Sequence, residues 1–215
     1  FQTGDYNTAV GKSSLAGQGP ECGDGAGSTY STGSYNTALG AESLNNTTSG
    51  ANNVAVGYQS SYSNTTGDYN SAMGYQALYS NTTGDYNTAF GSKALYSIDT
   101  SYPSTAFGYK ALEANTTGIR NTAVGYQAMK YNITGDFNVA VGHSALAVNT
   151  GDRNTAIGMY ALVNGDGQND NVGVGYETLM QNTGDYNTAI GTEALSSNTT
   201  ANDNSAFGFR AAYSN

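Results

Sequence analysis

The residues of this chain that most directly suggest chemistry are asparagines followed two positions later by serine or threonine. This pattern is the acceptor for N-linked glycans. It occurs at Asn45, Asn46, Asn64, Asn81, Asn115, Asn132 and Asn198. Because Asn, Thr and Gly favour turns, we expect the recurring Asn-Thr-Thr-Gly segments to be outer turns from which glycans can project. The alternative is that they are good turn sequences repeated by duplication.

Aspartates form a second recurring pattern, two residues before an asparagine. The acidic members are Asp5, Asp68, Asp85, Asp136, Asp152 and Asp185. Asp-x-Asn spacing can supply oxygen ligands for calcium. However, no second acidic position accompanies them, and Ile119 or Tyr102 occupies the same position without disturbing the surrounding pattern. We therefore expect solvated turn aspartates, with no metal and no cofactor.

The remaining reactive residues do not suggest a catalytic site. His143 is the only histidine, which excludes a histidine-rich metal site or a Ser-His-Asp triad elsewhere in a single chain. Cys22 is the only cysteine, so an internal disulfide is impossible. Every polar pattern is repeated, whereas a catalytic site is a unique arrangement of residues. We predict that the protein is not an enzyme.

The charge distribution excludes further classes of function. Sixteen acidic residues and seven Lys and Arg give a net charge of -9, with no basic stripe to follow a phosphate backbone. No apolar run approaches the roughly twenty residues of a membrane helix. We predict neither a nucleic-acid partner nor a membrane span.

The elements that carry these residues are set by a repeated phrase, Asn-Thr-Ala-(apolar)-Gly. Its glycines stand at 11, 40, 57, 74, 91, 108, 125, 142, 158, 175, 191 and 208, and almost every interval is seventeen residues. Self-similarity at fixed spacing indicates stacked supersecondary units. We predict an all-β fold, a β-solenoid (β-roll) of about twelve 17-residue coils. Residues 1–215 would form a single elongated domain, with an insertion at about 17–28 in an outer turn.

Each coil can be interpreted position by position. The residue before the glycine is always a sizeable apolar one, which predicts a core row, and the residue before that is alanine in eleven of twelve copies, which indicates close packing. Period-two alternation predicts a strand buried on both faces. Leucine usually follows the glycine by four residues. We interpret this as a second core row on a second short strand, with a helical turn as the alternative.

Asparagines at the start of the phrase predict a structural ladder. Its members are Asn7, Asn36, Asn53, Asn70, Asn87, Asn121, Asn138, Asn154, Asn171, Asn187 and Asn204. In-register stacking would let their side-chain amides bond to one another along the rod. Tyrosines also recur at fixed positions, which predicts aromatic rows. Each coil contributes only about two large apolar side chains, which is thin for an independent core. We therefore expect burial between chains, as a homo-oligomer.

Three segments resemble known repeats. Residues 53–57 and 138–142 resemble the head repeats of trimeric autotransporter adhesins, in which such a phrase forms one coil of a left-handed β-roll. Residues 183–191, with Ala194 and Leu195, resemble repeats of bacterial and viral tail-fibre-like proteins. The resemblance implies a homotrimer and an extracellular, cell-surface or virion-surface location. The coils of this chain are a few residues longer than adhesin repeats, and we expect neither a coiled-coil stalk nor a membrane anchor within residues 1–215.

These observations predict a structural component of an extracellular fibre or filament, a stiff rod that self-associates. The chain begins and ends at the same phase of its repeat, which predicts head-to-tail contacts within a longer polypeptide or between protomers. The alternative is an adhesin or receptor-binding fibre head whose Tyr and Thr rows bind surface glycans. A third hypothesis, an ice-binding solenoid, depends on a flat hydroxyl array from Thr66, Thr83, Thr117, Thr134 and Thr200.

Overall fold

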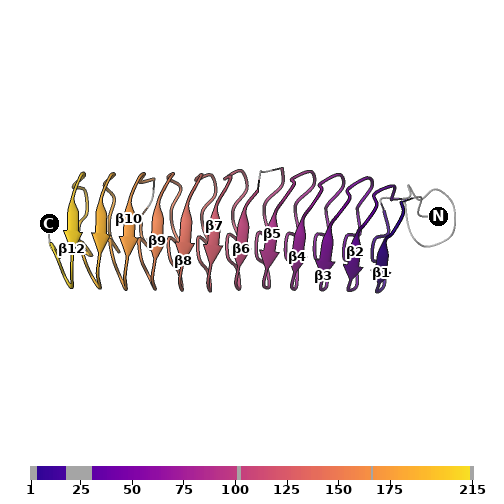
Figure 1. The fold of residues 1–215 in the computed structure, drawn as a ribbon, viewed down its shortest axis with the longest axis horizontal. Helices are drawn as coiled ribbons and strands as arrows, with labels where there is room; N and C mark the ends of the chain where they lie inside the picture. Colours follow the sequence, from indigo (N-terminus) through magenta and orange to yellow (C-terminus); the bar gives the residue numbers. More distant parts are fainter. Residues whose placement is uncertain (1–3, 18–30, 101–102, 166, 214–215) are drawn as a thin grey trace.

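Twelve short parallel strands stack along one axis in the computed structural model, which describes residues 4–17, 31–100, 103–165 and 167–213 (Figure 1). The strands are β1 (Thr8–Val10), β2 (Thr37–Leu39), β3 (Val54–Val56), β4 (Ser71–Met73), β5 (Thr88–Phe90), β6 (Thr105–Phe107), β7 (Thr122–Val124), β8 (Val139–Val141), β9 (Thr155–Ile157), β10 (Val172–Val174), β11 (Thr188–Ile190) and β12 (Ser205–Phe207). They form a single sheet in sequence order, and none of the described residues is helical. The predicted all-β solenoid is confirmed. Cys22 and the predicted insertion, apart from Gly17, lie outside the described residues.

Neighbouring coils are in register, so like residues lie on like. Between β5 and β6, Ala89 pairs with Ala106 and Phe90 with Phe107. The strand backbone bonds in both directions: the Gly91 amide donates to the Met73 carbonyl at 2.8 Å and the Thr88 amide to the Ser104 carbonyl at 2.9 Å. Each coil therefore templates the next, and a side-chain feature of one coil becomes a row along the rod.

The core of the rod is made by the alanine and leucine rows. Alanines at the strand centres, such as Ala89 and Ala106, and leucines of the following segment, such as Leu95 and Leu112, are fully buried. The predicted core row just before each glycine is wrong, because these side chains face solvent: Val10 is 55% exposed and Phe107 is 52% exposed. Strand alternation does place Asn and Ala on one face and Thr and the large apolar residue on the other. The alanine face lies inside, where the narrow coil is filled by a leucine and mostly short side chains.

The segment that carries the leucine is a pair of tight turns, so the predicted second strand is wrong. Gln76 and Leu78 both have left-handed backbone angles, with φ of 53° and 54°. The Ala77 amide closes a turn on the Gly74 carbonyl at 3.3 Å, and the Leu78 amide donates to the Ala94 carbonyl of the next coil at 2.9 Å. Left-handed geometry costs a non-glycine residue roughly 1–2 kcal/mol. The buried leucine side chain and the inter-coil hydrogen bond offset that cost.

One strand has glycine instead of alanine at its centre, which allows a prediction about the free energy of unfolding. Gly173 in β10 replaces the usual alanine, and a Cβ atom there would lie 3.4 Å from Leu162 Cδ1 and 3.6 Å from Leu179 Cδ1, both ordinary contacts. Gly173→Ala should raise the free energy of unfolding by about 1 kcal/mol, because it fills space and restricts the unfolded chain. Urea denaturation followed by circular dichroism measures this. An unchanged or lower midpoint would contradict the packing described for the alanine row.

Candidate functional site: the outer face of the sheet

The outer face of the sheet is the most extensive feature with potential for recognition. We define it as the first and third residues of the twelve strands. The first residue is Thr, Ser or Val, and the third is Val, Leu, Met, Phe or Ile, so no position on this face is charged. A charge-free surface of this length is notable in a chain with a net charge of -9. It differs in kind from an ordinary solvated protein surface.

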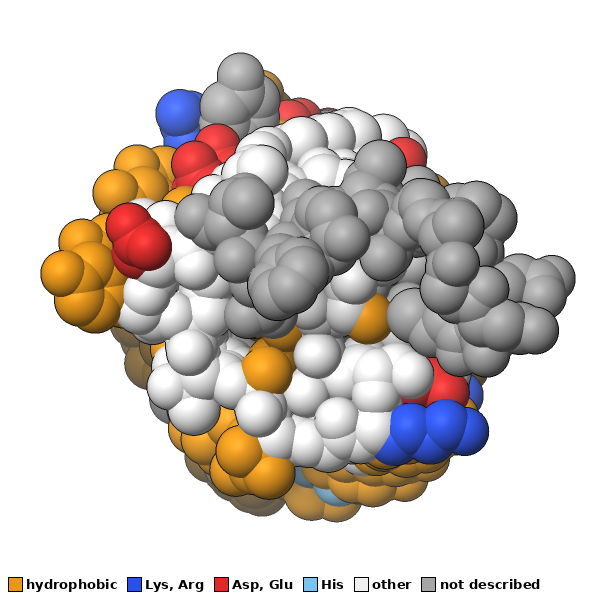
Figure 2. Space-filling view, turned by 90° about the vertical axis from the view of Figure 1, so that its right-hand side faces the viewer, with side chains coloured by type: hydrophobic (Ala, Val, Ile, Leu, Met, Phe, Trp, Pro, Cys, Tyr) orange, Lys and Arg blue, Asp and Glu red, His pale blue; other side chains and the backbone are white. Residues whose placement is uncertain are grey.

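The third residues form a continuous apolar row on this face. Phe90 and Phe107 stack with ring centroids 5.0 Å apart and an interplanar angle of 8°. Its members that count as exposed are Val10, Leu39, Met73, Phe107, Val124, Val141, Ile157, Ile190 and Phe207. Figure 2, which views the rod from the end nearest β1, shows hydrophobic side chains gathered at parts of the rim. Large contiguous apolar patches of this kind usually mark interaction surfaces.

Aromatic rows border the outer face on both sides. Tyr69 and Tyr86 stack two residues before the first residues of their strands, with centroids 5.0 Å apart and an interplanar angle of 1°. Tyr109 and Tyr126 stack just after the phrase glycines, at 5.2 Å and 20°, and His143 continues that stack. The predicted aromatic rows are therefore present as stacked groups. Within each stack the ring faces cover one another, so mainly ring edges and hydroxyl groups point outward.

This stacking bears on sugar recognition. Aromatic side chains present their faces to planar or apolar partners, and the faces between Tyr69 and Tyr86 are already occupied. Each ring keeps its other face, its edge and its hydroxyl group, so the stack covers one of the two faces of each ring. The aromatic rows therefore offer less support for glycan binding than the sequence pattern suggested.

Five of the predicted glycosylation sites have side chains that do not project from the rod. Asn45 and Asn46 are half-buried, whereas Asn64, Asn81, Asn115, Asn132 and Asn198 are all buried. Their side-chain nitrogens face inward; for example, Asn81 Nδ2 donates to the Gly84 carbonyl at 2.9 Å and to Asn64 Oδ1 at 3.1 Å. The expectation that these side chains lie outside the turn is wrong. A glycan on Nδ2 is incompatible with this buried geometry, because the same nitrogen closes the turn.

Asparagines of the predicted ladder form one line of hydrogen bonds along the rod. Most of these bonds join a side-chain amide to the backbone of the next coil, not to another side-chain amide as expected. Asn70 Oδ1 accepts from the backbone amide of Asn87 at 2.8 Å, and Asn70 Nδ2 donates to the Gly84 carbonyl at 2.8 Å. The side chain thus bonds to the backbone of the next coil at two points. Direct amide-to-amide bonds are confined to a few places, such as Asn204 Nδ2 to Asn187 Oδ1 at 2.9 Å. Ser104 takes the ladder position in its coil and accepts from the Asn121 amide at 3.3 Å.

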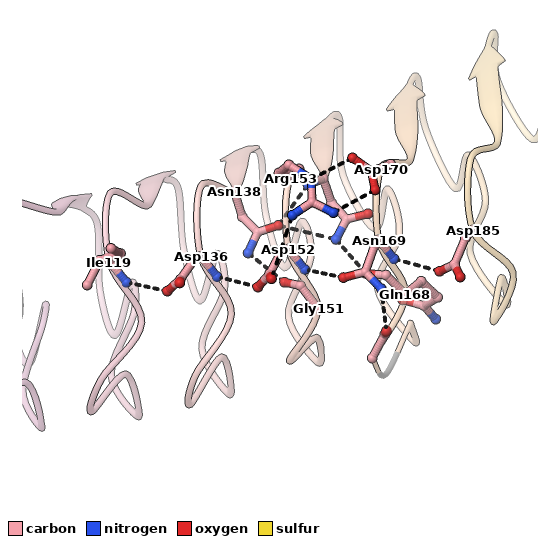
Figure 3. Close-up of polar contacts among 12 residues, drawn as sticks. Ile119, Asp136, Asn138, Gly151, Asp152, Arg153, Gln168, Asn169, Asp170 and Asp185 are labelled. Carbon is pink, nitrogen blue, oxygen red and sulfur yellow. Dashed lines mark hydrogen bonds and ion pairs between the residues drawn. The ribbon is translucent and has the colours of Figure 1, made fainter.

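The aspartate row makes a second, partly exposed ladder (Figure 3). Asp136 Oδ1 accepts from the Ile119 amide at 2.8 Å, and Asp152 Oδ1 accepts from the Asp136 amide at 2.9 Å. Asn169 continues the line, accepting from the Asp152 amide at 2.9 Å. One carboxylate oxygen of each aspartate in this line therefore serves the backbone of the preceding coil. Within the described part of the chain, no three His, Cys, Asp or Glu side chains are grouped as metal ligands.

A single bidentate ion pair bridges coils beside this row. Arg153 Nε and Asp170 Oδ1 are 2.7 Å apart, and the second nitrogen reaches Asp170 Oδ2 at 2.8 Å (Figure 3). The hydrogen bond from Arg153 lowers the pKa of Asp170 from its usual range. Both groups are open to solvent, so the pair fixes side-chain positions and contributes little stability.

The threonine row proposed for ice binding lies at the turn edge. Thr66, Thr83 and Thr117 are exposed there. The threonine one position earlier in the repeat can instead bond to the next coil, since Thr65 Oγ1 donates to the Thr82 carbonyl at 2.9 Å. A threonine row in strand geometry occurs instead on the outer face, at the first strand positions. It lies beside an apolar row whose residues range from Val to Phe, so the combined surface is uneven in height.

None of the described residues forms a helix long and apolar enough to cross a membrane.

Comparison with known proteins finds no similar protein: no protein family, curated protein or solved structure matches the chain.

Proposed function

We propose that this protein is the stiff structural rod of an extracellular fibre and that it associates with copies of itself through the outer face. The observation that carries the proposal is the apolar row. It takes one residue from every strand, from β1 to β12, and contains no charged residue. The fold leaves these side chains unpartnered, because its own core is filled by alanine and leucine. The extracellular location rests on the resemblance to fibre and adhesin repeats.

Rod stiffness is supported by bonding between every pair of neighbouring coils. Each strand pairs with the next in register, and buried asparagines and partly exposed aspartates add side-chain bonds between the same coils. In such a stack, stability is a sum of coil and coil-to-coil terms. A rod built in this way carries load along its axis without needing a globular core.

A second copy is the partner that best fits the outer face. At roughly 4.8 Å between strands and 3.3 Å per residue, a face twelve strands long and three residues wide covers on the order of 570 Å². Stable interfaces bury about 600–1,000 Å² per partner, so this face is close to the lower end of that range. Two copies also share the same axial repeat, so side chains of one row can interdigitate along the whole length. Elsewhere the net charge of -9 makes copies repel, which directs contact to the uncharged face.

A charged residue at the centre of the outer face should abolish this association. Phe107→Asp places a carboxylate in a row that becomes buried between copies, so we expect the oligomer to shift to a single chain at micromolar concentration. Sedimentation velocity measures the shift. The matched control is Thr117→Asp, at an exposed turn residue away from the outer face, and it should leave the oligomer intact. A wild-type chain that sediments as a monomer, or equal behaviour of both variants, would contradict the proposal.

The adhesin alternative remains testable on the same material. Exposed phenol hydroxyls of the aromatic rows, such as those of Tyr69 and Tyr86, can hydrogen-bond to sugars. A glycan array probed with the wild-type oligomer separates the two hypotheses. Binding that is lost on removing the hydroxyls of Tyr69 and Tyr86, while the oligomer persists, would favour the adhesin.

A further inference from the structure

Tyrosines at equivalent positions of neighbouring coils are held in contact by the register of the coils. Stacked groups occur at several places along the rod, namely Tyr6–Tyr35, Tyr58–Tyr75, Tyr62–Tyr79–Tyr96, Tyr69–Tyr86 and Tyr109–Tyr126. Their ring centroids lie between 5.0 and 5.7 Å apart. Because the backbone sets this spacing, the phenols remain neighbours whenever the coils are folded. The stacks therefore present pairs of oxidisable rings in fixed proximity.

The pair Tyr69–Tyr86 is the best placed for a reaction between rings. The rings are parallel within 1°, and the residues are 51% and 58% exposed, so a soluble oxidant can reach both. Their backbones are pinned: the Tyr86 amide donates to the Asp68 carbonyl at 3.0 Å, and the Tyr69 amide to the Ala51 carbonyl at 3.1 Å. Asn52 and Pro103 hold the same position in the flanking coils. The pair is thus isolated within its row, and coupling there gives one defined product.

We propose that Tyr69 and Tyr86 are a site of oxidative dityrosine cross-linking between the coils of β4 and β5. Each phenol loses one electron and one proton to give a phenoxyl radical. The two radicals combine through ortho carbons, forming one C–C bond, and the two ortho hydrogens then move to the phenolic oxygens. The chain loses two hydrogen atoms overall. Hydrogen peroxide, acting through a peroxidase, accepts the two electrons and two protons and is reduced to two molecules of water.

The cross-link suits the position of the pair on the rod. Both rings project from the rim of the outer face, and rotation about their side-chain bonds brings the ortho carbons together without moving the strands. The product joins adjacent coils covalently across a stack that is otherwise held by hydrogen bonds. Neither of the two linked coils can then unfold and separate from the other, so the rod resists coil-by-coil unfolding from its ends. The reaction needs one folded chain only, so it does not depend on self-association.

The test uses the full chain and a light-activated ruthenium oxidant with persulfate, which takes the two electrons and becomes sulfate. Cleavage on the amino side of Asp68, Asp85 and Asp99 separates peptides 68–84 and 85–98. We expect these peptides to be linked, with a mass lower by two hydrogens, and tandem mass spectrometry to assign the link to Tyr69 and Tyr86. The link should form within single chains at low protein concentration and disappear in urea.

Matched variants complete the test. Tyr86→Phe keeps the stacked ring but removes the phenol, so the Tyr69–Tyr86 link should be lost while circular dichroism is unchanged. Tyr131 is exposed and stacks on no other tyrosine among the residues that the structure describes, so Tyr131→Phe should keep the link. The proposal is overturned by the absence of the link in the folded wild-type chain. Equal yield in urea, or links formed only between chains, would overturn it as well.

Discussion

Gly91→Ala is expected to lower the free energy of unfolding by about 3–5 kcal/mol, because it combines a forbidden backbone angle with a backbone clash. Gly91 directly follows β5 and has φ of +132°, a conformation that L side chains rarely adopt. A Cβ atom there would lie 2.4 Å from the Gly108 carbonyl oxygen, which belongs to the backbone of the next coil. Neither atom can move without separating the two coils. Urea denaturation followed by circular dichroism measures the loss.

Gly167→Ala is the matched control for this prediction. Gly167 also has a left-handed angle, φ of +78°, but a Cβ atom there would meet no other heavy atom within 4 Å. Backbone strain alone should cost about 1 kcal/mol. If Gly91→Ala and Gly167→Ala cost the same, close contact between the corner glycines of successive coils is not what requires glycine.

Asn70→Leu is expected to cost about 2–4 kcal/mol, the second-largest effect. Leucine has a similar volume, but it cannot accept the hydrogen bond that the Asn87 amide donates to Asn70 Oδ1 at 2.8 Å. That amide is then left buried without its acceptor. The Gly84 carbonyl loses one donor but keeps Asn81 Nδ2 at 2.9 Å, which limits the total loss. The change in urea midpoint at constant slope gives the cost.

Asn70→Ser tests the cause of that loss. The coil that carries Ser104 shows that a serine hydroxyl can stand in the ladder, since Ser104 Oγ accepts from the Asn121 amide at 3.3 Å. We therefore expect Asn70→Ser to cost clearly less than Asn70→Leu, although serine is smaller and leaves more space. The opposite order would show that side-chain volume, rather than the hydrogen bond to the Asn87 amide, determines stability at this position.

Much of the architecture could be predicted from the sequence because the repeat is a direct record of the stacking. The regular spacing of the phrase glycines predicts the number of coils, and twelve strands are found at the predicted positions. Period-two alternation also assigns residues correctly to two faces. It does not say which face lies inside, and the prediction that both faces are buried is wrong for the row of larger apolar side chains, which faces solvent.

A signal for the correct choice was present in the variability of the two rows. The strand-centre position is alanine in eleven of twelve coils, whereas the position before the glycine varies from Val10 to Met73 to Phe107. Close-packed interiors do not accept such volume changes without compensation. Variation between Val and Phe at one repeated position therefore favours an outward-facing row, and near-invariance of a small residue favours the core.

The buried sequons could not be placed from their motif alone. Asn-x-Thr is common to acceptor sites and to turns in which Asn bonds back to the backbone, and only the contact of Asn81 Nδ2 with the Gly84 carbonyl distinguishes them. The leucine segment was equally ambiguous, because propensity gives no hint that Leu78 adopts a left-handed angle. That conformation is imposed by the narrow coil and by hydrogen bonds to the neighbouring coil.

Electron cryomicroscopy of the purified wild-type chain tests the central claim most directly, because it shows which surfaces meet in the assembled particle. The proposal predicts rods lying side by side, with the apolar row that includes Phe107 and Val124 buried between copies and the Thr-rich turns facing solvent. Single, separate rods with that row open to solvent, or particles that meet only through the turns, would contradict it.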